Sequence, residues 1–526
     1  MTDEIRMTKF LEEIMAFASR TGITYMSGNI YGGFSGFWDY GPIGVEIKNR
    51  IKEAWWNDFV RNRDDIVGYD GAVITHPKVW EASGHVNSFN DPLVFCQGKC
   101  KKKYRLDHVL EDLLKIKTED LTHDEMGHKL KENNIKCPNC DGELGEPTKF
   151  SLMFQTEVGA AQESSAVAYL RPENAQLIFS GFKNVIDSTR VKMPFGIAHS
   201  GVVFRNEISP RNFLFRVREY ELMEFEYFTD PDKTNDCPLF EEVAEVRINV
   251  YSREEQNNED FTDHYKILTA QETYDQGTFK NKWQAYWLTT FFLWFQELGI
   301  RKEKLRFRQH VETELSHYAL DTWDIDYQYP FGWKELMGCA NRGQFDLSQH
   351  QNLSKTKMEY VEDTGTGVKR YIPYVVAEPS VGVGRILLTI IAEGYTEEEV
   401  KGRKRSVLKI HPRMAPYDVA VFPLQKGDKL HELSRKIFRD LRAEAFYVTY
   451  DTGGSIGKRY RRQDEIGTPF CVTIDYESLA NGTVTIRNRD TMEQERASID
   501  TLAETLREKR KNFKISYENI KISSGF

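Results

Sequence analysis

The chain of 526 residues lacks the features of membrane-spanning, secreted and repetitive proteins. No stretch approaches the roughly 18 consecutive apolar residues that a transmembrane helix needs. Residues 1–6 contain neither the basic nor the apolar region of a secretory signal. The sequence also has no internal repeat and no low-complexity tract. We therefore expect a folded cytoplasmic protein, and its length allows two to four domains.

A surplus of positive charge is also missing, since the formal net charge is -9. This sum does not indicate a nucleic-acid-binding protein. In a large enzyme, however, a local basic face can supply phosphate contacts while acidic surface elsewhere outweighs it in the total. Net charge therefore leaves both an enzyme and a nucleic-acid-binding protein open.

Cysteine is scarce, and its distribution argues against a disulfide framework. The chain has seven cysteines, an odd number, and four of them form two close pairs. Cys137-Pro-Asn-Cys140 is typical of half a zinc ribbon, and Cys96 with Cys100 resembles the other half, although its gap is one residue longer than usual. Four thiolates complete a closed, structural Zn²⁺ site. Two alternatives stay open, namely four ordinary reduced cysteines or a histidine that replaces one thiol, the candidates being His108, His123 and His128.

Two arginine-containing motifs suit a nucleotide, although neither is a Walker loop. In Arg205-Asn206-Glu207 the two charged residues are two positions apart, so on one strand they would share a face. Phe215, Arg216 and Tyr220 return on the next segment. An arginine, an acid and an aromatic ring can together bind a triphosphate and a purine. A solvated hairpin with paired charges is the alternative.

The second motif is a glycine-containing segment that enters an apolar helix. Glu378-Pro-Ser380-Val-Gly382-Val383-Gly384-Arg385 precedes apolar residues 386–392. The glycines permit close approach of the backbone. Arg385 would lie at the start of the helix, where its guanidinium and the helix dipole both favour a phosphate.

The two motifs resemble motifs 2 and 3 of the class II aminoacyl-tRNA synthetases, at about 201–228 and 377–394. Gly41-Pro42-Ile-Gly44 and the helical pattern after it, at about 41–60, resemble motif 1 of the same family, which builds its dimer interface. The first motif, with Ser209-Pro210-Arg211 in its turn, is most similar to the glycyl enzymes. The resemblance implies a homodimer that binds ATP, Mg²⁺, glycine and tRNA(Gly).

The fold that this resemblance implies is α+β. A class II catalytic domain built on an antiparallel sheet is expected over 1–90 and 151–411. A zinc-ribbon-like, cysteine-rich insertion is expected at 91–150, and a second, polar insertion at 252–310. Residues 412–526 are expected to form an α/β anticodon-binding domain. Its basic and aromatic segment around residues 457–469, with residues 487–490, suits unpaired RNA bases.

The resemblance also implies roles for single residues in binding ATP. Arg205 contacts the α-phosphate, Arg385 faces the γ-phosphate, and Glu335 helps to hold Mg²⁺ between the phosphates; these three are the implied catalytic residues. Glu207 accepts a hydrogen bond from the adenine amino group, and Tyr220 stacks on the base where the family usually has phenylalanine. The other implied ATP-binding residues are Asn206, Phe215, Arg216, Leu336, Gly382, Val383 and Gly384.

Three glutamates are implied to surround the substrate ammonium, namely Glu173, Glu224 and Glu378. Converging carboxylates repel one another and resist ionisation, so a bound ammonium relieves the repulsion. A structural ion-pair network with Arg171 or Arg218 is the alternative.

Ser380 lies in the same glycine-binding segments, and Arg105 and Arg308 are the candidates for binding the substrate carboxylate. Two other classes of function stay open. One is a different class IIa synthetase, for serine, threonine or proline, and the other is a catalytically silent relative that serves as a nucleic-acid-binding subunit. The three glutamates argue against the first, and the nucleotide-site residues argue against the second.

Overall fold

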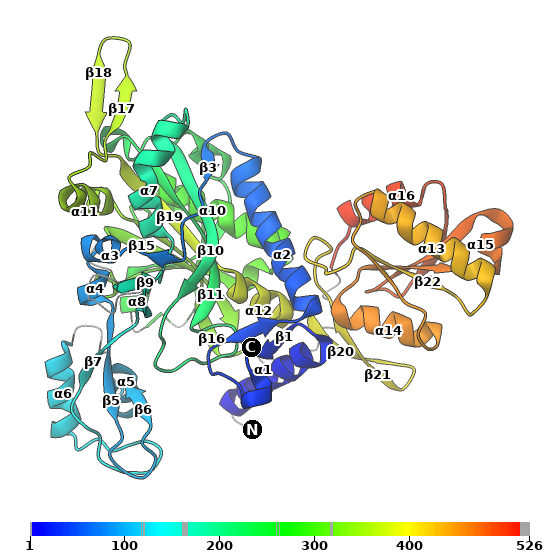
Figure 1. The fold of residues 1–526 in the computed structure, drawn as a ribbon, viewed down its shortest axis with the longest axis horizontal. Helices are drawn as coiled ribbons and strands as arrows, with labels where there is room; N and C mark the ends of the chain where they lie inside the picture. Colours follow the sequence, from blue (N-terminus) through cyan, green and yellow to red (C-terminus); the bar gives the residue numbers. More distant parts are fainter. Residues whose placement is uncertain are drawn as a thin grey trace.

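A computed structural model describes residues 3–116, 118, 121–159, 167–258, 260–261, 263–315 and 319–515. Residues 516–526 of the expected C-terminal domain, and residues 117, 119 and 120 of the expected cysteine-rich insertion, lie outside this range. Figure 1 shows a central body, a small lobe at the lower left and a C-terminal lobe at the right.

A nine-stranded sheet forms the centre of the molecule, in the order β13-β12-β14-β15-β16-β19-β11-β10-β3. The pairings are antiparallel, except that β3 with β10 and β12 with β14 are parallel. The expected antiparallel catalytic sheet is therefore confirmed. The strands are β3 (Ile66–Gly68), β10 (Phe195–Phe204), β11 (Glu219–Thr229), β12 (Arg247–Tyr251), β13 (Lys266–Thr269), β14 (Leu305–Gln309), β15 (Asp321–Tyr329), β16 (Gly332–Asn341) and β19 (Tyr374–Gly382).

The alternation of residues along β11 separates the two faces of this sheet. Met223, Phe225 and Tyr227 pack into the main hydrophobic core. Glu224 and Glu226, one position out of step, point to the opposite face, because successive side chains of a strand alternate. One face therefore builds the core, and the other presents acidic groups.

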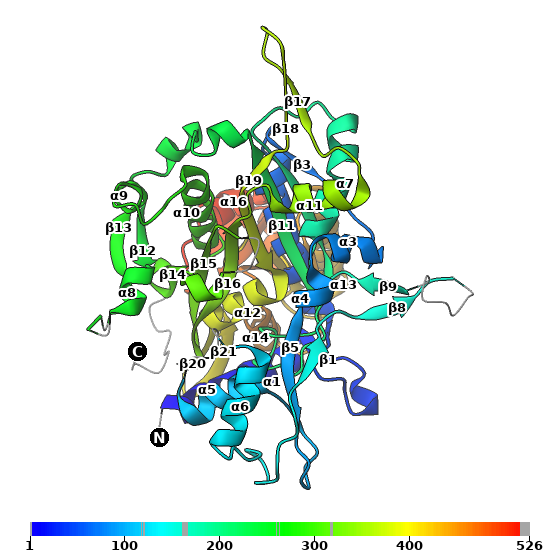
Figure 2. The same ribbon diagram turned by 90° about the vertical axis from the view of Figure 1, so that its left-hand side faces the viewer.

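Helices α2 (Pro42–Trp56), α10 (Lys282–Glu297) and α12 (Val383–Gly394) supply most of the helical residues of the main core, and α1 (Asp3–Thr21) adds Ile14, Phe17 and Ala18. Helix α2 begins with a proline, which needs no N–H donor in the first turn. Helix α10 is apolar on nearly all sides, and its Phe291 stacks on Phe59 with ring centres 4.2 Å apart. On the other face, α7 (Ala175–Ser188) and α11 (Phe345–Ser354) cover a second apolar cluster. Figure 2 shows these two helices on the opposite side of the sheet from α10.

The segment 252–310, which we expect to be an insertion, is not set apart from the catalytic body. Strands β13 and β14 belong to the central sheet, and α10 lies in the core. Only α8 (Arg253–Asn257) and the chain leading to β13 match the polar composition that suggested an insertion. The composition therefore identified the exposed edge of the sheet rather than a separate unit.

The lower lobe in Figure 1 contains the cysteine-rich segment. A three-stranded sheet in the order β6-β5-β7 packs with two helices around its own small apolar cluster. The elements are β5 (Asn90–Phe95), β6 (Lys103–Arg105), α5 (Leu106–Leu114), α6 (His123–Glu132) and β7 (Thr148–Ser151).

The C-terminal lobe is a five-stranded mixed sheet in the order β23-β22-β24-β25-β26, with its own core. Helix α15 ends at Asn481, and the next residue, Gly482, has a left-handed φ of 67° that suits glycine. The elements are β22 (Val419–Pro423), α13 (Asp428–Ala443), β23 (Val448–Tyr450), α14 (Ile456–Ile466), β24 (Phe470–Ile474), α15 (Tyr476–Asn481), β25 (Thr483–Asn488), β26 (Gln494–Ser498) and α16 (Leu502–Lys511).

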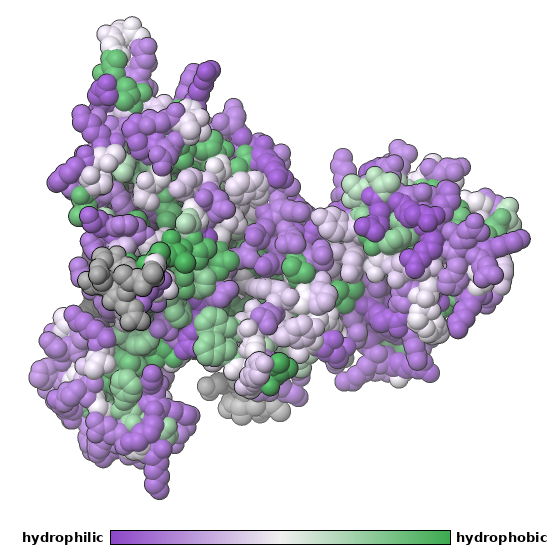
Figure 3. All heavy atoms as spheres, in the orientation of Figure 1, coloured by the Kyte–Doolittle hydropathy of each residue, from purple (hydrophilic) through white to green (hydrophobic). Residues whose placement is uncertain are grey.

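Short elements complete the fold, among them the hairpin β17–β18 that projects at the top of Figure 1. Hydrophilic residues dominate the face shown in Figure 3, with apolar residues gathered towards the middle of the central body. In the described part of the chain, every helix is too short or too polar to cross a membrane. The remaining elements are β1 (Thr24–Met26), β2 (Trp38–Tyr40), β4 (Ile74–Thr75), α3 (Pro77–Ala82), α4 (His85–Ser88), β8 (Gln155–Glu157), β9 (Val167–Leu170), α9 (Ala270–Asp275), β17 (Tyr360–Asp363), β18 (Val368–Tyr371), β20 (Tyr395–Val400) and β21 (Arg403–Leu408).

Buried ion pairs join the C-terminal lobe to the central body. Asp464 in α14 is fully buried and accepts hydrogen bonds from Arg405 of β21 at 2.9 Å and from Arg487 of β25 at 2.8 Å. Arg489 donates to the carbonyl of Ile410 at 2.9 Å. The bonds of Arg405 to Asp464 and of Arg489 to Ile410 cross the junction, whereas the Arg487–Asp464 pair lies within the lobe, and the charged groups are almost entirely removed from water.

Replacing Asp464 with alanine should lower stability strongly, because it leaves Arg487 buried without a carboxylate and leaves Arg405 with Glu398 as its remaining acidic partner. Breaking a buried ion pair on one side costs about 3 to 5 kcal/mol. We expect a clear loss in the midpoint of thermal or urea unfolding. The control is Glu465→Ala, which removes a partly exposed pair with Arg20 and should cost at most about 1 kcal/mol. Equal effects of the two substitutions would contradict the role given to Asp464.

Candidate active site

One pocket collects residues from the β10–β11 hairpin, β16, β19 and the start of α12. Arg205 and Arg385, which lie far apart in the sequence, both line it. So do eight more of the residues predicted to bind ATP, whereas Asn206 and Val383 are not among its lining residues. The eight are Glu207, Phe215, Arg216, Tyr220, Glu335, Leu336, Gly382 and Gly384.

We expected Arg205 and Glu207 to lie on a strand, but β10 ends at Phe204, so both residues lie outside it. They lie in the turn that follows, where the N–H of Glu207 donates to the carbonyl of Arg205 at 2.7 Å. The Arg205 guanidinium lies 5.8 Å from the centre of the Tyr220 ring on β11. A tight turn rather than strand alternation therefore brings both charges to the pocket.

Arg385 is fixed at the first turn of α12 by contacts from two other segments. Its Nη1 atom lies 2.9 Å from Glu335 Oε1 and donates to the carbonyl of Glu335 at 3.0 Å. The guanidinium also covers the Phe215 ring, 4.6 Å from its centre. A preorganised guanidinium at a helix N-terminus is suited to a phosphate.

Glu207 is held by Arg216, whose Nε atom donates to Glu207 Oε2 at 2.6 Å. Two predicted ATP-binding residues are therefore paired with each other at the rim of the pocket. Burial raises the pKa of Tyr220, so its hydroxyl stays neutral and its ring is available for stacking.

Next to this pocket lies a buried cluster of carboxyl groups that includes all three predicted glycine-binding glutamates. Glu224 Oε1 accepts from the N–H of Asn174 at 2.7 Å, and Oε2 accepts from the Ser380 hydroxyl at 2.8 Å. Glu173 lies 3.2 Å from Nε2 of His85. The structure therefore brings Ser380 and the glutamates together, as predicted.

An arginine that the sequence analysis missed lies in this cluster. Arg342 directly follows β16, and its Nη1 atom donates to Glu378 Oε2 at 2.8 Å. Its Nε atom donates to Asp346 at 2.8 Å, and Nη2 lies 4.0 Å from Glu173. No sequence motif marks Arg342, and the pairing of β16 with β19 brings it here.

The arginines considered as alternative partners of the glutamates are engaged elsewhere. Arg171 donates to the carbonyls of Gly71 at 2.6 Å and Val202 at 2.7 Å. Arg218 donates to the carbonyls of Glu207 and Ser35. An ion-pair network does exist, but Arg342 rather than Arg171 or Arg218 builds it.

The cluster has more acids than cations, and this imbalance appears in their pKa values. Burial and the neighbouring Glu173 raise the pKa of Glu224 to about 7. Burial, together with Glu224 and Glu173, raises the pKa of Glu378 to about 8 against the opposing effect of Arg342. His85 and Arg342 keep the pKa of Glu173 well below its usual range, although burial opposes them. An additional cation would relieve the repulsion that remains.

Comparisons with known proteins extend over nearly the whole chain. The glycine–tRNA ligase of Caldanaerobacter subterraneus subsp. tengcongensis is 45% identical over 507 residues, covering 95% of this chain and 98% of the relative. The glycine–tRNA ligase of Treponema denticola is 41% identical over 509 residues, covering 96% and 98%. That of Bacillus thuringiensis subsp. konkukian is 42% identical over 505 residues, covering 95% and 99%. The chain belongs to the glycine–tRNA ligase family.

A family model described as an anticodon binding domain matches residues 418–509, which are almost the whole C-terminal lobe. Together with the antiparallel catalytic sheet, this match confirms the predicted class II synthetase fold. Several basic residues predicted to face RNA are instead structural. Arg459 is buried and donates to the carbonyls of Pro423 and Leu424, and Arg487 and Arg489 lie in the lobe junction. Lys458 and Arg462 are exposed.

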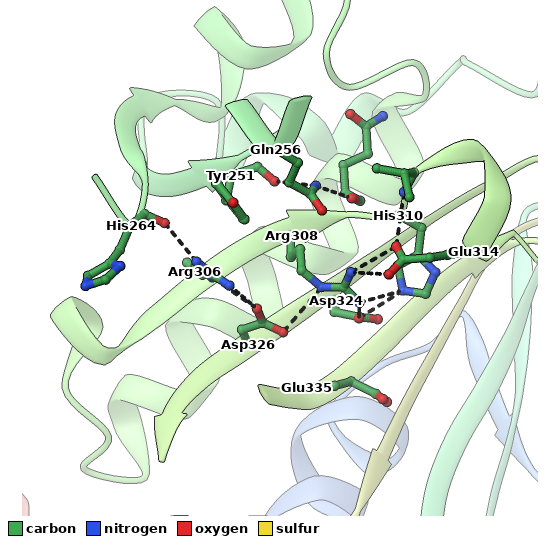
Figure 4. A network of polar contacts seen from close by, with 12 residues as sticks. Tyr251, Gln256, His264, Arg306, Arg308, His310, Glu314, Asp324, Asp326 and Glu335 are labelled. Carbon is green, nitrogen blue, oxygen red and sulfur yellow. Dashed lines mark hydrogen bonds and ion pairs between the residues drawn. The ribbon is translucent and has the colours of Figure 1, made fainter. Parts of the chain in front are cut away.

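The two arginines predicted to bind the substrate carboxylate lie away from the carboxyl cluster. Arg105 pairs with Asp107 and, at 2.9 Å, with Asp91 in the lower lobe. Figure 4 shows Arg308 in a network on β14 and β15, where it bonds Glu314 at 2.9 Å and Asp324 at 2.6 Å. Arg308 lines a second pocket beyond Arg385 and Glu335.

The four predicted metal-binding cysteines converge in the lower lobe. The sulfurs of Cys96, Cys100, Cys137 and Cys140 all lie within 4.8 Å of one another. A tetrahedral Zn²⁺ with Zn–S bonds of about 2.3 Å needs sulfurs about 3.8 Å apart. The separations of 3.5 Å for Cys96 with Cys140 and 3.4 Å for Cys100 with Cys137 are close to this value. The donor set therefore fits a structural zinc ion, with no histidine needed.

We expect the purified protein to contain about one zinc ion per chain, measured by atomic emission, because the four thiolates converge. Cys140→Ala should lose most of the metal and lower the unfolding temperature. Cys237→Ala, which removes a buried cysteine outside the cluster, is the control and should keep the metal. A wild-type protein with less than about half an equivalent of zinc would show that the four cysteines are ordinary thiols.

Proposed function

We propose that this protein is a glycine–tRNA ligase that activates glycine with ATP and transfers it to tRNA(Gly). The observation that supports this most is the position of Arg205 and Arg385 on one pocket, directly beside the acidic cluster. If ATP occupies the pocket and the ammonium group of glycine lies in the acidic cluster, the carboxylate of glycine lies next to the α-phosphate of ATP. The proposal agrees with the names of the relatives, which match 95% and 96% of this chain.

In the first step a carboxylate oxygen of glycine attacks the α-phosphorus, and the bond to pyrophosphate breaks. The carboxylate is already an anion at neutral pH, so the step needs positioning and charge neutralisation rather than a general base. Arg205 would neutralise the α-phosphate and Arg385 the γ-phosphate, while Tyr220 and Glu207 bind adenine. The products are glycyl-adenylate and pyrophosphate.

Glu335 is the residue that would hold Mg²⁺ against the phosphates. A Cβ atom on Gly338 would lie 3.6 Å from Asp324 Oδ1 and 3.8 Å from Glu335 Oε1, so two carboxylates border one small space. Magnesium prefers oxygen ligands of this kind and, when bound, neutralises the phosphate charge. Glu335 also keeps Arg385 in place.

In the second step a ribose hydroxyl of the terminal adenosine of tRNA attacks the carbonyl carbon of glycyl-adenylate, and AMP leaves. The C-terminal lobe would bind the anticodon, as the matched family model indicates. Within the amino-acid site, Glu173, Glu224 and Glu378 would surround the ammonium, and crowding around Ser380 would exclude side chains larger than hydrogen.

The test of the function is ATP–pyrophosphate exchange with a panel of amino acids, followed by charging of tRNA(Gly). We expect exchange with glycine only, because the buried carboxyl groups bind an ammonium and leave little room for a side chain. Arg205→Ala should reduce glycine-dependent exchange by at least about a hundredfold, the effect of losing one preorganised donor of about 3 kcal/mol.

The matched control for this substitution is Arg190→Ala, which removes an exposed arginine between α7 and β10 and should keep the exchange rate. Exchange with serine, threonine or proline would assign another specificity. A protein that binds tRNA but catalyses no exchange would be a non-catalytic relative.

We also propose that the protein is a homodimer formed through α2 and the segment before it. This segment exposes large apolar side chains to solvent, with Ile30 86% and Tyr31 88% exposed. Exposed apolar groups in one region are typical of a protein interface.

Sedimentation at micromolar concentration should therefore show a dimer. Ile30→Asp should shift it towards the monomer, because the charge would have to be buried in the interface. Tyr476→Ser, which removes a 60% exposed ring on the C-terminal lobe, is the control and should leave the dimer intact. A wild-type monomer under these conditions would refute the proposal.

A further inference from the structure

A fourth glutamate lies in the acidic cluster and has no role in the mechanism described above. Glu226 follows Glu224 by two positions on β11, so both side chains point to the same face. Its side chain is completely buried. Among the residues that the structure describes, no N–H or O–H group donates a hydrogen bond to either carboxyl oxygen of Glu226. A buried carboxylate in this situation would be strongly destabilising.

The register of the central sheet identifies the neighbour of Glu226. On β11 and β19, Glu224 pairs with Ser380 and Tyr227 pairs with Ala377, which places Glu226 opposite Glu378. Directly opposed side chains in an antiparallel pair have Cβ atoms about 5 Å apart, and two like charges there repel each other. Two ionised carboxylates at these positions are therefore incompatible with burial.

The other charged and titratable groups around Glu226 leave this pair short of positive charge. Arg342 is the cation that acts on Glu226, and it already binds Glu378 and Asp346. Burial, Glu378 and Glu224 raise the pKa of Glu226 well above its ordinary value. The groups that act electrostatically on Glu226 are Glu224 on β11, Glu378 on β19, Arg342 after β16 and Asp346 on α11. The Cys339 thiol of β16 lies on the opposite, core face of the sheet.

We propose that Glu226 is a positioning residue that stays protonated and donates a hydrogen bond to Glu378, so that Glu378 keeps the negative charge facing the substrate ammonium. This inference rests on the proposed glycine-activating function. A neutral carboxyl group opposite Glu378 removes the repulsion between the two side chains. Its O–H group can also donate a hydrogen bond to the Glu378 carboxylate, and such a bond to an ionised acceptor is stronger than one between two neutral groups. Glu226 thus lowers the pKa of Glu378 without touching the substrate.

The consequence is a defined dependence of glycine binding on pH. The ammonium of glycine binds the ionised forms of Glu224 and Glu378, so the KM for glycine rises as the pH falls through their pKa values. Removing the donor at position 226 raises the pKa of Glu378, which moves this rise to higher pH. Binding of ATP, which uses other residues, stays unchanged.

The experiment measures the KM for glycine against pH by ATP–pyrophosphate exchange. Glu226→Met has a similar volume but no donor, and should raise the KM for glycine about tenfold near neutral pH, equivalent to a shift of one pKa unit. The KM for ATP should not change. Glu226→Gln retains an N–H donor and should restore the KM for glycine and its pH profile to within about threefold of the wild type.

The control is Glu393→Met, which removes another buried glutamate, bonded to Arg301 and Tyr327 away from the cluster. It should lower the unfolding temperature without moving the glycine pH profile. A wild-type profile for Glu226→Met, or equal shifts for the Met and Gln variants, would overturn the inference. Wild-type protein without glycine-dependent exchange would instead refute the proposed function, and the inference with it.

Infrared spectroscopy gives a second readout that does not depend on the folding of the Met variant. A protonated carboxyl group has a C=O stretching band that a carboxylate lacks. We expect such a band in the wild type at mildly alkaline pH, its persistence when glycine is added, and its loss in Glu226→Gln. An identical spectrum for Glu226→Gln would show that Glu226 is ionised.

Discussion

The antiparallel pairing of β11 with β19 is the constraint on which the rest of the site depends. It sets Glu224 opposite Ser380, and it directs β19 into α12 so that Arg385 lies at the same pocket as Arg205. A shift of one residue would turn the acidic side chains of β11 into the hydrophobic core and the aromatic ones into the site. Because that core contains Met223, Phe225 and Tyr227, burial of apolar surface fixes the register.

The site that results is dominated by an imbalance of charge. Glu173, Glu224, Glu226, Glu378 and Asp346 gather around Arg342, so the acids outnumber the guanidinium. A buried carboxyl group is stabilised by a neighbouring cation, by a hydrogen-bond donor or by protonation. His85 contacts Glu173, and Asn174 and Ser380 donate to Glu224. Because the negative charge of the cluster is not fully compensated, a small ammonium group would be a favourable ligand.

The nucleotide side of the site has the opposite character. Its arginines are held by contacts within the protein, Arg385 by Glu335 and Phe215, and Arg216 by Glu207. Holding the guanidinium groups in place reduces the reorganisation needed when negative charge develops on a phosphate. A cationic pocket beside an acidic one is the arrangement that the proposed joining of an amino acid to a nucleotide would require.

The local elements could be predicted from the sequence because their signals are local. Pro42 at the start of α2, the alternation along β11 and the paired cysteines each depend on neighbours within a few residues. The same holds for the arginine and glutamate motifs of the pocket. The polar stretch before α10 shows the limit of such signals, since composition did not distinguish the exposed edge of a sheet from an insertion.

The partners of buried charges could not be predicted in this way. Arg342 and Glu226 reach the cluster only through the pairing of β16, β19 and β11. Arg487 is buried against Asp464, and Arg489 is buried against the carbonyl of Ile410. The sequence by itself determined the class of fold, the positions of its motifs and the residue types of the site. Only the tertiary structure decided which charges meet, because contacts between distant strands and lobes leave no pattern along the chain.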